Sequence, residues 1–173
     1  RGVGTSTNGS GAFGASLNLQ TDWLSPDAYA EIASSAGSFN TQKNTLRFAS
    51  GLLNNHFVFS GRLSKINSAG YVDRASANMK GYTFQLAYKD EKRLLKGVAF
   101  GGHEITYQAW YGLDKETLKS NRTYNPAGEI YSPQGVLTGF YDNQVDNYAQ
   151  DHFQLHWKEL LQNAWTFSLG LNY

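Results

Sequence analysis

The chain has 173 residues and a net charge of +1, with 15 Lys and Arg residues against 14 Asp and Glu residues. Acidic and basic residues are interspersed, so the sequence has no cluster of Lys and Arg residues that would indicate a nucleic-acid partner. There are no cysteines, which excludes disulfide frameworks and thiolate metal sites, and no run approaches the ~18 consecutive apolar residues of a transmembrane helix.

Aromatic residues make up 14% of the chain, 18 residues are glycine and only three are proline. A composition rich in Tyr, Phe, Trp, Gly, Ser and Asn predicts an all-β protein. The length is sufficient for one domain with a respectable core.

Residues 1–21 are dominated by Gly, Ser, Thr, Asn and Ala. This composition suits a flexible linker, but glycines also allow the close backbone approach that a compact, packed segment needs. Phe13, Leu17 and Leu19 are interleaved with the glycines and argue against a pure linker.

Strand patterns recur from residue 28 to the end of the chain. Because successive strand side chains point to opposite faces, alternating apolar and polar residues indicate a sheet with two different surroundings. Apolar and polar residues alternate at every position of segment 165–173, whereas the alternation in 28–37 is weak and makes this segment a weaker strand candidate. Segment 94–105 is ambiguous, although Leu94, Val98 and Phe100 can share a face. The expected strands are 28–37, 42–51, 57–64, 82–89, 94–105, 153–158 and 165–173.

The connections between these strands alternate in length. Tight turns are expected at 52–55, 90–93 and 160–163, and longer excursions at 67–80 and 106–148. This rhythm predicts tight turns at one end of the sheet and long loops at the other, as in bacterial outer-membrane barrels.

The two strand faces also differ in a way that is typical of membrane barrels. Aromatic residues lie at the ends of the apolar faces, as interfacial girdles require, and the opposite faces carry residues that suit a wet lumen. The pattern by itself favours a membrane barrel, while a soluble β-sandwich gives the same alternation and remains open. The aromatic residues are Tyr82, Tyr88, Trp157, Trp165 and Tyr173, and the opposing residues are Arg62, Lys89, His156 and Lys158.

Residues 1–21 also carry an ordered set of glycine and apolar positions. The set is Arg1, Gly2, Gly9, Ala12, Phe13, Gly14, Leu17, Asn18, Leu19 and Thr21. It resembles the closing stretch of the plug domain in TonB-dependent outer-membrane receptors. The family pattern there is an Arg-Gly pair, a polar turn and a Gly-x-x-Ala-φ-Gly-Gly-x-φ-Asn-φ-x-Thr run (φ apolar), and the first barrel strand follows. The chain departs from it at Val3 for the usual proline, at Asn8 for an aromatic residue and at Ala15 for the second glycine.

Further along the chain, the Gly37-Ser38-Phe39 turn, segment 62–73 and segment 107–112 look like the barrel start of such receptors from Bacteroidetes-type bacteria. The resemblance implies that residues 1–21 are the C-terminal end of the plug domain. It implies that residues 22–173 are the first seven or so strands of a 22-stranded antiparallel transmembrane β-barrel, with a long extracellular loop at 106–148. The chain is then expected to be part of a longer receptor.

A receptor of this kind binds a large, scarce nutrient (ferric siderophore, haem, cobalamin or glycan) and imports it actively across the Gram-negative outer membrane. The implied partners are outer-membrane lipid, TonB acting through plug regions outside this chain, a bulky nutrient such as a metal chelate, and the remainder of the same receptor chain. The alternatives are a soluble all-β glycan-binding module and a passive porin or adhesin barrel.

Two sets of candidate site residues follow. The resemblance implies that Arg1 pairs with glutamates of the barrel wall, since an unpaired buried charge is costly.

Irregular tracts as long as 106–148 are usually functional or disordered, and their rigid aromatic residues suit a bulky ligand. A loop folded over the barrel mouth would bury the same aromatic residues for structural reasons. The ligand-binding candidates are Tyr107, Trp110, Tyr111, Arg122, Tyr124, Tyr131 and Tyr141.

Catalytic and metal chemistry are not expected. His152 and His156 would share a strand face but lie roughly 13 Å apart at ~3.3 Å per residue, too far for one metal ion. His103 and Glu104 lack a third ligand nearby, and the sequence holds neither a Gly-x-Ser-x-Gly elbow nor a P-loop. We therefore expect a protein that is not an enzyme and holds no cofactor.

Overall fold

The computed structural model describes residues 24–162 and 165–173, so the predicted plug segment with Arg1 lies outside the described residues. The described part consists of β-strands and one short helix, which confirms the all-β fold class. It contains no helix long and apolar enough to cross a membrane. The elements are β1 (Ala28–Gly37), β2 (Thr41–Ser50), β3 (Phe57–Ser68), β4 (Ala77–Lys89), β5 (Arg93–Tyr107), α1 (Lys115–Ser120), β6 (Glu129–Tyr131), β7 (Leu137–Phe140), β8 (Val145–Leu160) and β9 (Thr166–Asn172).

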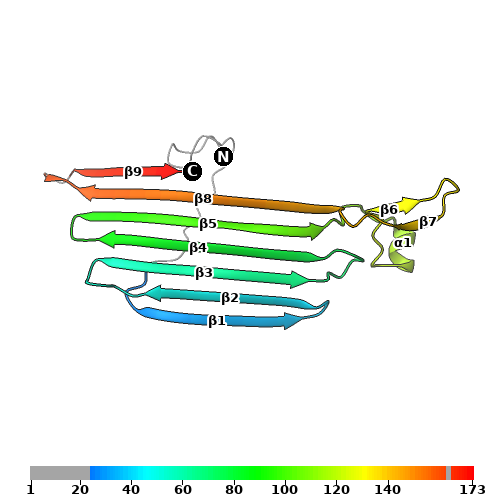
Figure 1. Cartoon of the computed structure of the whole chain (residues 1–173), viewed down its shortest axis with the longest axis horizontal. Coiled ribbons are helices and arrows are strands. Elements are labelled where there is room, and N and C mark those ends of the chain that lie inside the picture. Colours follow the sequence, from blue (N-terminus) through cyan, green and yellow to red (C-terminus); the bar gives the residue numbers. More distant parts are fainter. Residues whose placement is uncertain (1–23, 163–164) are drawn as a thin grey trace.

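Seven of the strands form one antiparallel sheet in the order β1-β2-β3-β4-β5-β8-β9. Neighbours in the sheet follow one another along the chain, apart from the excursion that holds α1, β6 and β7. The seven strands lie side by side in a single layer, with α1 and the β6–β7 pair beyond one end of it (Figure 1). The predicted antiparallel sheet of seven strands is therefore confirmed.

The connections are sorted between the two ends of the sheet largely as predicted. Connections 51–56 and 90–92, together with the one from β8 to β9, lie at what we call the turn end (Figure 1). Connections 69–76 and 108–144 lie at the opposite end, the loop end. The turn 38–40 is an exception, because it is short and lies at the loop end.

This short turn is docked onto its neighbouring loop. Phe39 and Asn40 have φ of 59° and 56°, a left-handed conformation that suits a tight hairpin. The Phe39 ring meets Tyr71 edge-on with centroids 5.5 Å apart, and the Phe39 carbonyl accepts a hydrogen bond of 2.8 Å from the Ala69 amide. These contacts hold the conformation, which costs free energy for a bulky residue.

Four strands extend further toward the loop end than the alternation predicts. β3 ends at Ser68 and β4 begins at Ala77, so the connection between them spans 69–76 rather than 67–80. β5 ends at Tyr107 and β8 begins at Val145, so the long tract spans 108–144 rather than 106–148. The added residues are mostly polar. These residues still pair with the neighbouring strands, because the hydrogen bonds between strands join backbone amides and carbonyls and do not depend on the side chains.

The register gives the sheet two different faces. Residues directly opposite one another in antiparallel strands point to the same face, and Phe59, Leu86, Gly97, Leu155 and Leu171 form one such row across five strands. We call the face that contains this row the apolar face and the other the mixed face. The apolar face carries Ile32, Leu46, Phe48, Phe57, Phe59, Leu63, Tyr82, Phe84, Leu86, Tyr88, Leu95, Ala99, Phe153, Leu155, Trp157, Phe167, Leu169 and Leu171.

The apolar side chains touch one another but are not covered by a second layer of described residues. Phe59 and Phe84 stack with centroids 6.3 Å apart, and Trp157 meets Phe167 edge-on at 5.3 Å. Leu86 nevertheless keeps 58% of its surface exposed. The buried residues of the sheet all belong to the mixed face: they are Thr45, Ala49, Val58, Ser60, Gln85, Ala87 and Val98.

Leu94, Val98 and Phe100 of β5 do share a face, as the sequence suggests, but it is the mixed face. The apolar face of β5 is built instead from small residues, with Gly97 and Ala99 between the larger side chains of β4 and β8. The pattern of β5 is ambiguous because both of its faces carry apolar residues.

Candidate functional site

The predicted ligand-binding residues lie in the tract 108–144 and at its border with β5. This tract contains more regular structure than expected, since it carries α1 and the β6–β7 hairpin. Tyr107 belongs to β5, Tyr131 to β6, and the other five candidates to connecting segments. The tract is attached to the 69–76 loop by two groups of contacts, one around Asn125 and one around Arg74.

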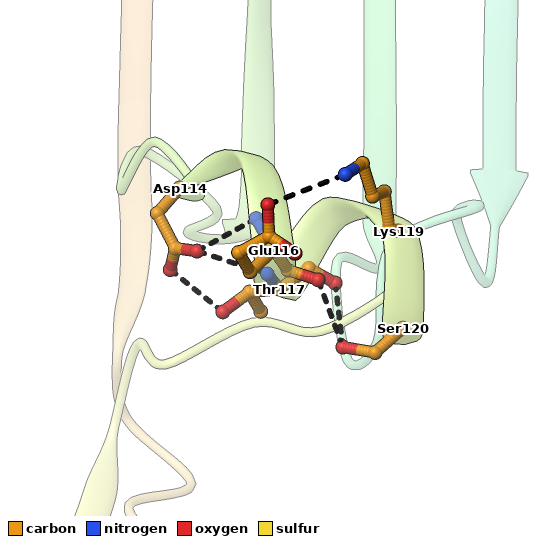
Figure 2. Close-up of polar contacts among 5 residues, drawn as sticks. All are labelled: Asp114, Glu116, Thr117, Lys119 and Ser120. Atoms are coloured by element: carbon orange, nitrogen blue, oxygen red, sulfur yellow. Dashed lines mark hydrogen bonds and ion pairs between the residues drawn. The ribbon is translucent and has the colours of Figure 1, made fainter.

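Helix α1 begins at a strong N-cap. The Asp114 carboxylate accepts hydrogen bonds of 2.9 Å from the Glu116 and Thr117 amides and one of 2.6 Å from the Thr117 hydroxyl (Figure 2). The bond from the Thr117 hydroxyl is the main reason that the pKa of Asp114 is lowered. One turn later, Lys119 pairs with Glu116 at 3.3 Å and the Ser120 hydroxyl donates to the Glu116 carbonyl at 3.1 Å. The cap gives a very short helix a defined start on an exposed surface.

Asn125 joins three segments of the loop end. Its side-chain nitrogen donates to the carbonyls of Asp73 at 2.9 Å and Gln108 at 3.0 Å, and its side-chain oxygen accepts from the Ala127 amide at 3.0 Å. Asn125 is only 1% exposed. Because a buried amide that loses such partners costs about 1–3 kcal/mol, these bonds fix the tract against the 69–76 loop.

Arg74 reaches from the 69–76 loop into the same region. Its guanidinium donates to the carbonyls of Asn125 and, at 3.2 Å, Ala127. The guanidinium carbon lies 3.5 Å from the centroid of the Phe140 ring and 5.7 Å from that of Tyr107. Arg74 therefore combines hydrogen bonds with cation–π contacts, an arrangement for which the planar guanidinium is well suited.

Tyr107 and Tyr141 are brought together beside this arginine. The Tyr107 hydroxyl donates to the Tyr141 carbonyl at 2.9 Å and approaches the Ala127 carbonyl at 3.3 Å. The Tyr107 hydroxyl is thus used to hold the loop, while the Tyr141 side chain remains 54% exposed. Of this pair, Tyr141 keeps a side chain that a ligand can contact.

Tyr124 and Tyr131 converge on Glu129. The Tyr124 hydroxyl donates to one carboxylate oxygen at 2.5 Å and the Tyr131 hydroxyl to the other at 2.6 Å. The hydrogen bond to Glu129 is the largest cause that raises the pKa of Tyr124 to about 12, and it also raises the pKa of Tyr131. The same bonds lower the pKa of Glu129, with Tyr124 as the first cause. At neutral pH the Glu129 carboxylate is charged and accepts hydrogen bonds from the neutral hydroxyls of Tyr124 and Tyr131.

The other three candidates also lie on the surface. Trp110 and Tyr111 are 64% and 58% exposed, and Arg122 is exposed as well. The structure therefore does not gather all seven predicted residues into one pocket. It divides them into the Tyr107–Tyr141 pair, the tyrosines around Glu129 and an exposed set available to a partner molecule.

The histidines of β8 do not form a metal site. His152 stacks on Phe100 with centroids 4.8 Å apart, and His156 lies 3.2 Å from the side-chain oxygen of Gln154. Within residues 24–162 and 165–173, no group of three His, Cys, Asp or Glu side chains is placed to bind a metal ion.

The apolar face has polar borders at both ends. At the turn end, Arg93 of β5 pairs with Glu159 of β8 at 2.9 Å. At the loop end, the Tyr82 hydroxyl donates to the Asp151 carboxylate at 2.7 Å, across the glycine at position 101 of the intervening strand. The apolar face is therefore a band with a border at each end.

Sequence reasoning missed Arg74, Asn125 and Glu129, whose roles depend on partners far along the chain. The structure marks Arg74 by its φ of 62°, a conformation that non-glycine residues seldom adopt, and this angle cannot be read from the sequence. No family model matches the chain, and no curated protein and no solved structure is significantly similar to it.

Proposed function

We propose that this chain is part of a TonB-dependent outer-membrane receptor, a protein that binds a large, scarce nutrient at its extracellular loops and imports it actively. In this proposal the apolar face of the sheet contacts lipid, the mixed face lines the barrel interior, and the loop end is extracellular. Residues 1–21 form the end of the plug. The substrate is one of the ferric siderophores, haem, cobalamin or a glycan.

The single observation that carries the proposal is the continuous apolar face. The chain alternates so that seven neighbouring strands place most of their large apolar side chains on one side of one layer. In a soluble sandwich these side chains would form a covered core, because exposed apolar patches larger than a few hundred Å² are rare. Leu86, Phe153 and Leu171 instead keep 58%, 48% and 52% of their surface exposed. This exposure supports the proposal that the apolar face is in contact with lipid.

The borders of this face support the same orientation. Tyr88 and Trp157 lie near the turn end and Tyr82 near the loop end, as aromatic girdles do at the two bilayer interfaces. Apart from the turn 38–40, short turns lie at one end of the sheet and long loops at the other, as on the periplasmic and extracellular sides of outer-membrane barrels.

The mixed face suits an aqueous or plug-filled interior. Gln85 is only 3% exposed, and its side-chain oxygen and the Arg62 Nε have no hydrogen-bond partner among the described residues. Buried polar atoms need partners, and a wet lumen or a plug domain supplies them. Unpaired strand edges are not tolerated in lipid, so the proposal requires further strands to close the barrel beside β1 and β9.

The loop end supports the binding role. Asn125 and Arg74 hold the tract 108–144 in a defined shape, and a preorganised surface loses less conformational entropy on binding. Exposed aromatic side chains on such a surface, among them Trp110 and Tyr111, suit a bulky ligand. The long tract is therefore the part of this chain that we expect to contact the nutrient.

The orientation can be tested with spin labels on neighbouring residues of β8. This chain has no cysteine, so Phe153→Cys and His152→Cys each add one labelling site to it, the first on the apolar face and the second on the mixed face. Any cysteine elsewhere in the intact receptor is first replaced by serine. The intact receptor carrying either label is reconstituted into phospholipid vesicles. We expect the label at 153 to be relaxed by lipid-soluble oxygen and the label at 152 to be relaxed by a water-soluble nickel chelate.

Equal relaxation of both labels by the nickel chelate would show that the apolar face is not in lipid, and the soluble all-β module would then be the better explanation.

Transport is tested separately. A deletion strain is grown on ferric chelates, haem, cobalamin or glycans as the limiting nutrient, with the intact receptor restored. Growth that depends on the receptor but not on TonB would favour a passive porin.

A further inference from the structure

The two borders of the apolar face differ in their charge. At the turn end the charges of Arg93 and Glu159 neutralise each other in an ion pair of 2.9 Å. At the loop end, Lys65 of β3 and Lys80 of β4 are directly opposite one another in the register. Both lysines are exposed, and both lie on the apolar face, one step beyond its last apolar row.

This placement follows from the neighbouring pairs. Leu63 and Tyr82, which form the last apolar pair of β3 and β4, lie two residues from the lysine pair on each strand. Two residues along a strand return to the same face. The lysine side chains therefore border the band directly, at the height where a bilayer changes from hydrocarbon to head groups under the proposed orientation.

Like charges directly opposite one another destabilise a sheet unless something neutralises them. Among the described residues, no carboxylate lies within 4.0 Å of either ammonium group. His103 is the residue opposite Lys80 on β5, and its ring is 2.6 Å from the Asn147 side-chain oxygen. Among the described residues, Lys65 and Lys80 thus place two ammonium groups at one point without an ion-pair partner within that distance, and the one nearby carboxylate, that of Asp151, accepts a hydrogen bond from Tyr82.

A hollow in the same face adjoins this pair. It has a volume of about 430 Å³ and is lined by Leu63, Tyr82, Lys80, His103, Ala149 and Asp151, among others. Asp151 is the one acidic side chain among the lining residues, and its carboxylate accepts the hydrogen bond of 2.7 Å from Tyr82. The lining thus combines apolar side chains with the Lys80 ammonium, and a lipid at the bilayer interface likewise combines apolar chains with a charged head group.

We infer that Lys65 and Lys80 bind the phosphate head group of a membrane lipid, whose glycerol or sugar backbone occupies the adjoining hollow. The inference rests on the proposed function, since it takes the apolar face to lie in lipid. Each basic residue near a membrane surface strengthens the attraction of anionic lipid about fivefold, so the pair amounts to about thirtyfold. Because the opposite border carries a neutral ion pair, the preference is confined to the leaflet at the loop end.

Native mass spectrometry of the intact receptor tests this. The purified protein is incubated with diphosphoryl lipid A, and retention is compared between the wild type and the double variant Lys65→Gln/Lys80→Gln. We expect retention to fall about thirtyfold in the double variant and to be largely kept in Lys65→Arg/Lys80→Arg. The matched control, Lys89→Gln/Lys96→Gln, removes two lysines from the mixed face and should retain lipid as the wild type does.

Two further arms separate the possible outcomes. Phosphatidylcholine, whose head group has no net charge, should be retained equally by all variants, and excess inorganic phosphate should not displace lipid A. Equal loss in both double variants would overturn the inference, and complete displacement by inorganic phosphate would show a phosphate site rather than a lipid site. The spin labels on β8 report the proposed function independently: if they place the apolar face in lipid while lipid A retention is unchanged, only the lysine inference fails.

Discussion

At the scale of single residues, the loop end is organised by polar groups that act across the chain. Asn125 satisfies two carbonyls from different segments, and Arg74 lies against Phe140 while it donates to the carbonyls beside Asn125. Such groups stabilise only when every partner is present, because an unsatisfied buried amide costs more than a satisfied one contributes. This explains how a tract with few buried apolar residues keeps a defined shape.

The trio around Glu129 predicts a pH dependence. The pKa of Glu129 is lowered, so its contribution to stability is present above its unfolded-state pKa and is lost as the pH falls through the lowered value. The pKa of Tyr124 is raised, so its contribution is present below its ordinary value of 10.0 and is lost as the pH rises through about 12. The contacts should therefore stay intact through the neutral range and fail in acid and in strong base.

Glu129→Gln should move the pKa of Tyr124 from about 12 down toward 10.0, because the charged acceptor that stabilises the neutral phenol is removed. The difference between the tyrosinate absorbance titrations of the variant and the wild type measures this shift. Glu116→Gln on α1 is the control, since Glu116 pairs with Lys119 rather than with a tyrosine. Identical titrations of wild type and Glu129→Gln would contradict the contact.

At the scale of elements, β5 shows why small residues occur in the middle of the sheet. Gly97 and Gly101 both lie on the apolar face, but their surroundings differ. A Cβ at Gly101 would lie 2.6 Å from the Gln150 carbonyl oxygen and would also collide with the Asp151 carboxylate. A Cβ at Gly97 would have no neighbour closer than 4.0 Å. Only one of the two glycines is therefore required by packing.

Gly101→Ala should lower the free energy of unfolding by about 1–3 kcal/mol, because the added carbon forces β5 and β8 apart and disturbs the Tyr82–Asp151 hydrogen bond. Gly97→Ala, the matched control, should raise it by about 0.5–1 kcal/mol, since alanine restricts the unfolded strand more than glycine does. Urea unfolding of the intact receptor in detergent measures both. Equal effects of the two substitutions would show that the close approach at Gly101 does not constrain the sheet.

At the scale of the whole molecule, seven strands of residues 24–162 and 165–173 form one layer with two surfaces, and these residues enclose no core between two layers. Leu155 and Gln154 are neighbours on β8 that face opposite surfaces. Leu155 is 39% exposed, so in water an arginine at this position would change stability by only about 0.5 kcal/mol. In lipid the same change places a charge in hydrocarbon. The two surroundings therefore give different expectations for one substitution.

Leu155→Arg should reduce the free energy of folding into vesicles by about 2–4 kcal/mol if the residue lies near the bilayer midplane, whereas Gln154→Arg should cost far less. Urea-dependent folding of the intact receptor into phospholipid vesicles measures the two variants side by side. If Leu155→Arg is no more damaging than Gln154→Arg, the apolar face is not in contact with lipid.

The sequence by itself determined the strands, most of the turns and which residues share a face, since a period of two residues is a local property of the chain. Its errors lie where local patterns are weak. The strands β3, β4, β5 and β8 continue into mostly polar residues, and α1, with only six residues, is too short to show a helical period.

Only the tertiary structure decided which residues of different strands meet. The opposition of Lys65 and Lys80 and the hydrogen bond of Tyr82 to Asp151 across β5 depend on register, which is a property of pairs of strands. The contacts of Asn125 with Asp73 and Gln108 join segments distant along the chain. Such contacts arise from the summed geometry of many backbone pairings, so no short window of the sequence contains them.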